Sequence, residues 1–153
     1  MKTASSEADS ALLNAFSTQI ETGNAKVVLS SDKKWELLKK LSCFSSSGRI
    51  EPSKLLRSKE RELFKNDPII RMKQIVDGLQ MFKLDACLTD DSDVLICGDG
   101  FFEIGLICKY SALVEHAKEV FDWPQHIYVF SQEKPWCFSY MFEDYMFWGG
   151  YTR

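Results

Sequence analysis

The sequence predicts an α+β fold, in which N-terminal helices pack on a mainly antiparallel C-terminal sheet that one helix interrupts. Two observations support this prediction. Through the first 80 residues the apolar side chains recur at helical intervals, whereas from residue 83 they form short runs or alternate, as in strands. Helices followed by a group of strands are typical of α+β folds, where the helices cover one face of an antiparallel sheet.

The length of 153 residues fits a single domain, 1–153. At about this size, folding buries roughly 68–70% of the surface of the unfolded chain, which is enough for a core that needs neither disulfides nor metal. Residues 1–6 are polar, and we expect them to be disordered.

The first elements are predicted to be a helix, a short strand and a second helix. Ser6–Asp9 has the spacing of a capping box, and apolar residues follow it at helical intervals: Leu12, Leu13, Phe16 and Ile20. Thr22–Asn24 ends this helix, and Lys26–Ser30 is the short strand. Ser31 or Asp32 can cap the second helix, which carries on one side Trp35, Leu38 and Leu41.

Residues 52–82 form a basic section that is predicted to hold two helices with a break near Asn66. Asp67 and Pro68 fit an N-cap and a first helical residue, and the helix that follows has an apolar stripe: Ile69, Met72, Ile75, Val76 and Leu79. The basic residues within 54–73 fit either a nucleic-acid-binding helix or a solvated amphipathic helix. The solvated helix is favoured, because interspersed acidic residues dilute the positive charge.

The rest of the chain is predicted to supply strands and one helix. Leu84–Leu88 fits a strand, and Val94–Cys97 is a continuous apolar run, as expected of a central strand covered on both faces. Asp99–Gly100 is a strong signal for a two-residue hairpin turn, which leads into a strand at 101–108. A helix that begins at Tyr110–Ser111 and closes at Pro124 follows.

The aromatic-rich end of the chain, Trp136–Tyr151, predicts two neighbouring antiparallel strands, which follow a further strand at His126–Phe130. Glu143–Asp144 connects the pair without a glycine to supply positive φ. Four aromatic side chains alternate and therefore point to one face of the sheet: Trp136, Phe138, Tyr140 and Phe142. This stripe fits either the core or a partner interface, and the core is favoured.

The cysteines and the apolar segments indicate a soluble, cytoplasmic protein without membrane contact. The five cysteines include no C-x-x-C pair, and most lie in apolar runs, so we expect reduced thiols at Cys43, Cys87, Cys97, Cys108 and Cys137. The N-terminus lacks the apolar core of a signal peptide. No window approaches the ~18 apolar residues of a membrane span.

The sequence predicts neither catalysis nor a metal or cofactor site. Asp90–Asp93 lacks the sixth-position glycine of an EF-hand loop, and Gly98–Gly100 has no lysine behind it, as a phosphate loop would. His116 and His126 stand in no local nucleophile signature, and His116 is expected to be exposed. Glu103 is expected on the solvent face of its strand.

Charge and aromatic residues are distributed unevenly along the chain. Residues 1–80 carry 14 Lys and Arg against 10 Asp and Glu (+4), whereas residues 81–153 carry 5 against 12 (−7) and 16 of the 20 aromatics. An acidic, aromatic surface is poorly suited to phosphate but suits a protein partner, because Tyr and Trp are preferred interface anchors. The predicted partner-binding residues are the acidic loops and nearby aromatics: Asp90, Asp91, Asp93, Glu143, Asp144, Tyr145 and Trp148.

With its ending Trp-Cys-Phe-Ser-Tyr-Met-Phe-Glu-Asp-Tyr-Met-Phe-Trp-Gly at 136–149, the chain resembles the immunity proteins that accompany bacterial polymorphic and contact-dependent-inhibition toxins. The resemblance covers about the last 60 residues, from Val94 on. It implies a cytoplasmic protein that binds one cognate toxin domain and blocks its active site or substrate path, and it assigns no toxin-contact residue.

The leading hypothesis is therefore a non-catalytic binding protein that neutralises a cognate protein toxin, with a basic nuclease as the favoured toxin. An acidic patch would speed encounter with such a partner, and aromatic anchors would hold the complex. The alternative is a nucleic-acid-associated regulatory module that uses the basic helices 54–73. An enzyme with an unrecognised site ranks third.

Overall fold

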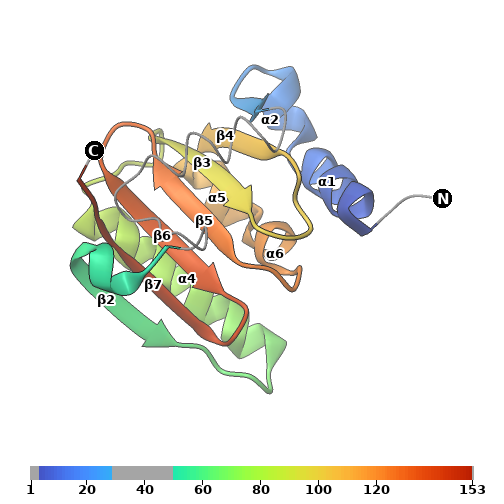
Figure 1. Cartoon of the computed structure of the whole chain (residues 1–153). Helices are drawn as coiled ribbons and strands as arrows, with labels where there is room; N and C mark the ends of the chain where they lie inside the picture. The colour runs from blue at the N-terminus through green and yellow to red at the C-terminus, as the bar shows by residue number, and fades with distance from the viewer. Residues whose placement is uncertain (1–3, 29–49, 153) are drawn as a thin grey trace.

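The fold is built on a sheet of seven antiparallel strands in the order β1-β4-β3-β5-β6-β7-β2, and helices cover one of its faces (Figure 1). The computed structural model describes residues 4–28 and 50–152. In this part of the chain the strands are β1 Ala25–Val28, β2 Leu56–Glu62, β3 Asp93–Gly98, β4 Gly105–Lys109, β5 Ile127–Ser131, β6 Trp136–Met141 and β7 Tyr145–Gly150. The helices are α1 Ala4–Ala15, α2 Ser17–Glu21, α4 Pro68–Asp85, α5 Tyr110–Glu115 and α6 Ala117–Phe121, with a 3-10 turn, η1, at Pro52–Lys54. The predicted α+β class is confirmed.

Strands β5, β6 and β7 are buried on both faces of the sheet, and this accounts for the aromatic residues of the second half. On the helix-covered face, Phe138, Tyr140 and Trp148 pack with residues of α1, α4, α5 and α6 in one large cluster. Alternate positions of the same strands point the other way and form a second cluster, which includes Tyr128, Phe130, Cys137, Phe147 and Tyr151. Aromatic side chains of the second half therefore fill the core on both faces of these strands.

Helix α4 runs along the sheet behind β6 and β7 (Figure 1). The predicted N-cap is confirmed, because the Asp67 carboxylate accepts hydrogen bonds from the backbone N–H groups of Ile69 (2.9 Å) and Ile70 (3.2 Å). The helix buries Ile75, Leu79 and Phe82. It also comes so close to β7 that a Cβ on Gly78 would lie 2.5 Å from the Met146 side chain, so glycine permits this contact.

Two helices were predicted in the basic section, and the prediction of the first is wrong, because residues 56–62 form the edge strand β2. This strand pairs with β7, and all its residues are exposed. The pairing gives hydrogen-bond partners to the outer backbone N–H and C=O groups of β7. This stabilisation comes from a strand distant in sequence, so the local pattern of apolar residues cannot predict it. Arg57 has a φ of 54°, where the register shifts, and charged side chains line the strand, as is common at sheet edges.

Two further predictions for residues 84–108 are wrong. Residues 84–88 are not a strand, since α4 continues to Asp85 and the buried side chains of Phe82 and Ala86 extend its inner stripe. Asp99–Gly100 is not a two-residue hairpin turn, since β3 ends at Gly98 and β4 begins only at Gly105. The intervening loop is held by Gln125 Oε1, which accepts hydrogen bonds from three consecutive backbone N–H groups (2.7–3.2 Å) of residues 100–102. In this loop the backbone N–H groups donate to a side-chain oxygen and not to the carbonyl groups of a paired strand.

The N-terminal predictions are largely confirmed. The helix from residue 6 to 21 exists, although it breaks at Phe16 into α1 and α2, and Gly23 ends it with a φ of 78°. The short strand appears as β1, paired with β4 at the opposite edge from β2. Helix α1 begins at Ala4, inside the stretch 1–6 that was expected to be disordered. The helix predicted after Ser31 and the thiol of Cys43 lie outside the described residues.

Candidate functional site

The two acidic loops lie at opposite ends of the sheet, so they do not form one face as the sequence suggested. The strand register shows this: Val94 pairs with Ser131, and the neighbouring Phe130 pairs with Cys137. At the other end, Ile127 pairs with Tyr140, just before the turn that joins β6 to β7. We call the end that carries Asp90–Asp93 the loop end, and the end that carries the β6–β7 turn, residues 142–144, the hairpin end.

At the loop end most of the acidic charge is compensated. Asp90 forms an ion pair with Lys83 (N···O 2.7 Å), and Asp93 forms one with Lys109 (3.0 Å). The pKa of Lys109 is raised, first by its hydrogen bond to Asp93. The loop is therefore a set of exposed ion pairs more than an acidic patch.

At the hairpin end Asp144 anchors the β6–β7 turn. It has a φ of 79°, and its backbone N–H donates to the Met141 carbonyl (3.1 Å). Its carboxylate binds Arg71 (2.5 Å) and Lys65 (3.3 Å), and Arg71 also donates to the Tyr140 hydroxyl (2.8 Å). Burial lowers the pKa of Arg71, but these two hydrogen bonds more than offset it and raise the pKa above its ordinary value. Asp144 is thus engaged inside the protein.

His126 fixes the other side of the same turn. Its side chain is buried, with Nδ1 2.7 Å from the Asp99 carboxylate and Nε2 2.7 Å from the Glu143 carboxylate. Both contacts are hydrogen bonds when both ring nitrogens carry hydrogen. Phe142 stacks on the imidazole, with ring centroids 5.0 Å apart. The sequence could not reveal this cluster, because its members come from three separate segments.

The two aromatic anchors predicted for the partner face belong largely to the core. Trp148 is fully buried, and its indole N–H donates to Asp85 (2.9 Å), so Trp148 cannot serve as a surface anchor. This hydrogen bond, together with Lys59, lowers the pKa of Asp85 despite some burial. Tyr145 is half-buried, packs against the second cluster and stacks on Phe147. The hydrogen bond to Asp85 holds the Trp148 ring in the cluster on the helix-covered face, and strand alternation directs the Tyr145 ring to the cluster on the opposite face.

Exposed apolar side chains concentrate at the hairpin end. The described residues include six large exposed ones, of which only Leu56 and Leu84 lie elsewhere. The other four stand before α4, on its first turn or on the β6–β7 turn, and we call them the hairpin-end apolar surface: Phe64, Ile69, Ile70 and Phe142. Ile69 was predicted to lie in the buried stripe of its helix, yet it is 82% exposed. Phe142 is likewise exposed, unlike Phe138 and Tyr140 of the same stripe.

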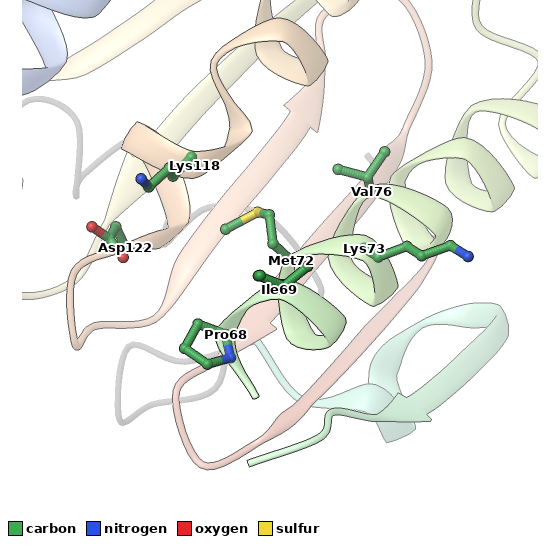
Figure 2. Close-up of a pocket in the computed structure, with 7 residues that line it drawn as sticks. All are labelled: Pro68, Ile69, Met72, Lys73, Val76, Lys118 and Asp122. Carbon is green, nitrogen blue, oxygen red and sulfur yellow. The ribbon is translucent and has the colours of Figure 1, made fainter. Parts of the chain in front are cut away.

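An apolar groove of about 510 Å³ lies beside this surface, between α4 and α6 (Figure 2). Its lining residues are Pro68, Ile69, Met72, Lys73, Val76, Lys118 and Asp122. A second hollow of about 250 Å³ shares Pro68, Met72 and Asp122 with the groove and reaches Tyr140 and Phe142. The groove therefore continues to the hairpin turn.

An acidic hollow of about 350 Å³ lies on the other side of the turn, against the edge strand β2. It brings the predicted residues Glu143, Asp144 and Tyr145 together with two carboxylates that the sequence did not single out, Glu60 and Glu62. Glu60 and Glu62 line this hollow because residues 56–62 form a strand beside β7, and the sequence analysis had predicted a helix there.

The positive charges of the basic residues within 54–73 are partly compensated by ion pairs. The first helix that was predicted to present them does not form, since residues 56–62 are the strand β2. Lys59 pairs with Asp85, while Lys65 and Arg71 share Asp144. These ion pairs reduce the positive charge that a phosphate backbone would meet.

The cysteines and histidines of the described residues also have defined surroundings. Four free cysteines are present, of which Cys87 is exposed and three are buried: Cys97, Cys108 and Cys137. Burial raises the pKa of the Cys108 thiol to about 12. The His116 side chain is only 19% exposed, lies against the Phe16 ring and contacts Gln19 of α2 (3.3 Å), so its expected exposure is wrong.

Within residues 4–28 and 50–152, no group of three or more His, Cys, Asp or Glu side chains is placed to hold a metal ion. Helices in the same part of the chain are all too short or too polar to cross a membrane. Neither a scan against protein-family models nor a search of curated proteins found a match to this chain.

Proposed function

We propose that this protein is a non-catalytic binding protein that neutralises a cognate protein toxin by masking the toxin's active or substrate-binding site. The contact surface is the hairpin end. The observation that supports this most is that four of the six exposed large apolar residues of the described chain stand before α4, on its first turn or on the β6–β7 turn, and that Ile69 among them lines the groove. Exposed apolar patches beside polar rims are typical of protein-binding surfaces.

The hairpin end is also held rigidly, which suits an inhibitor. Asp144 is fixed by Arg71 and Lys65, and Glu143 is fixed by the buried His126. These contacts hold Phe142 between them, so little conformational entropy is lost when a partner binds.

The acidic hollow favours a nuclease as the toxin. Glu60 and Glu62 line it together with Glu143, which also contacts His126, and one base, Lys65, which pairs with Asp144. Nucleases bind phosphate through Lys and Arg, and a carboxylate surface can occupy those same side chains.

The test takes the protein encoded directly upstream of this one as the candidate toxin, co-expresses its C-terminal domain with this protein, and follows with a cleavage assay on the purified pair. We expect growth to be restored and nuclease activity to be lost at one equivalent of inhibitor. The variant Ile69→Asp should lose both effects and keep its thermal midpoint, because Ile69 is 82% exposed, whereas Asp90→Asn, Asp91→Asn should keep both. Toxicity that persists beside the folded wild-type protein would overturn the proposal.

A further inference from the structure

The strand β2 leaves one backbone edge of the sheet open. It is the last strand in the sheet order, and all seven of its residues are exposed, whereas β1 at the opposite edge has four residues (Figure 1). The Leu63 N–H donates to the Asp144 carbonyl beside β7 (2.7 Å), so by strand alternation the backbone groups of Glu60 and Glu62 point away from β7. Outward N–H and C=O groups of this kind are a template on which a further strand can pair.

Within the regularly paired run 59–62, the two basic side chains lie on the helix-covered side and are already engaged. Lys59 forms an ion pair with Asp85 of α4 (2.9 Å), and the Arg61 guanidinium lies over the Trp148 ring, 5.7 Å from its centroid. Arg61 also donates to the outward Glu60 carbonyl (2.8 Å), an exposed hydrogen bond that an N–H of an added strand can replace. Lys59 and Arg61 are therefore not the side chains that select a partner.

The two acidic side chains of the same run, Glu60 and Glu62, lie on the opposite side of the sheet. Their register partners on β7 belong to the second cluster, and side chains of paired residues share a face. In the part of the chain that the structure describes, neither glutamate forms an ion pair. Opposite charges on neighbouring strands stabilise a sheet, so a strand with Lys or Arg at two alternate positions would complement them.

These glutamates also argue against a second copy of this chain as the added strand. Two β2 strands paired antiparallel about a two-fold axis form one continuous sheet, in which the glutamates of one copy stand opposite those of the other. The lysine and arginine side chains would likewise meet on the other face. Like charges directly opposite each other destabilise a strand pair, so charge selects a different chain with basic residues.

We infer that the open edge of β2 pairs with an extended segment of the partner protein that carries Lys or Arg at two alternate positions, opposite Glu60 and Glu62. The inference rests on the proposed function, since it assigns this segment to the neutralised toxin. The strand β2 ends beside the β6–β7 turn, so the added strand extends the sheet at the hairpin end and directs its basic side chains toward the acidic hollow. Backbone hydrogen bonds hold the segment, and the glutamates select its sequence.

The experiment titrates the isotope-labelled full chain with synthetic peptides of the length of β2 and follows amide hydrogen exchange. Two peptides alternate Thr with either Lys or Glu. A third is the Lys peptide with N-methyl groups on the backbone of its lysines, which keeps the charge and removes the N–H groups that would face β2. We expect the Lys peptide to bind about tenfold more tightly than the other two and to slow exchange at Glu60 and Glu62 by about tenfold. The amides of residues 59 and 61 point to β7 and should not change.

Charge reversal separates selection by the two glutamates from a general attraction to an acidic protein. Glu60→Lys, Glu62→Lys should prefer the Glu peptide. Asp90→Lys, Asp91→Lys, at exposed positions of the loop end, makes the same change in net charge and should still prefer the Lys peptide.

Three results would overturn the inference: unchanged exchange at residues 60 and 62, an N-methylated peptide that binds as tightly as its parent, or a preference that reverses in both variants. A dimer in sedimentation whose dissociation speeds exchange at residues 60 and 62 would assign the edge to a second copy and would equally overturn it.

Growth protection separates this inference from the proposed function. If the wild type protects cells and Glu60→Lys, Glu62→Lys protects them equally, the inference about β2 fails alone. If the Lys peptide binds as expected but the wild type gives no protection, the proposed function fails alone.

Discussion

The loop end and the hairpin end both carry acidic residues, yet only one of them has the features of a binding surface. At the loop end, Asp90 and Asp93 are matched by Lys83 and Lys109. At the hairpin end the ion pairs are turned inward to hold the β6–β7 turn, and apolar side chains remain outside. A run of charge in sequence therefore says little until its partners are known. What remains exposed and uncompensated identifies the surface.

The largest effect is expected for Trp148, which separates core from surface at the hairpin end. Trp148→Ala should lower the free energy of unfolding by about 3–5 kcal/mol, because the ring is fully buried. Trp148→Phe should cost less, since it keeps most of the packing and loses the hydrogen bond to Asp85. Denaturant unfolding measures both. A change in affinity with unchanged stability would return Trp148 to the partner face.

A smaller loss is expected for His126→Ala, about 2–3 kcal/mol. The variant removes the imidazole contacts with Asp99 and Glu143 and the stacking with Phe142, and Glu143 is partly exposed, so the loss stays below that of a fully buried ion pair. Hydrogen exchange should rise at residues 142–144 and stay unchanged at 90–93. Equal exchange changes at both ends would show that His126 does not hold the hairpin turn specifically.

The smallest effect is expected for charge reversals on exposed residues, which sharpen the comparison kinetically. Glu62→Lys, in the acidic hollow, should slow association with the partner several-fold and weaken its salt dependence, because rim charges steer encounter. The matched reversal Asp91→Lys at the loop end should change the association rate by less than about twofold. Stopped-flow binding at two ionic strengths checks this, and a larger effect from Asp91 would move the contact surface to the loop end.

The sequence predicted the elements whose periodicity is set locally. Helix α4 follows from the Asp67 cap and its apolar stripe, and β6 and β7 follow from alternating aromatics. It missed β2, since a charged edge strand is stabilised by pairing with a distant strand. It missed the loop after Gly98 because that loop is held by Gln125 from another segment.

The candidate site was predictable only in part. Glu143, Asp144 and Tyr145 are consecutive in the chain, and the fold adds Glu60 and Glu62 of a distant strand to the hollow that they line. Trp148 was misplaced, because strand alternation does not say whether a residue's face is covered, and here both faces are. The sequence did not identify Ile69 and Phe142 as surface residues. Each stands at one end of an apolar or aromatic stripe, and the spacing of a stripe does not show whether its end residue is buried or exposed.

The most direct test compares two residues of one helix. Ile69 on the first turn of α4 is 82% exposed, and Leu84 on its last turn is 75% exposed, so Asp at either position should change folding stability little. We expect Ile69→Asp to weaken binding to the cognate toxin domain by about 2 kcal/mol or more, measured by calorimetry, and Leu84→Asp to leave it unchanged. The opposite result, or equal losses from both variants, would contradict the hairpin end as the binding surface.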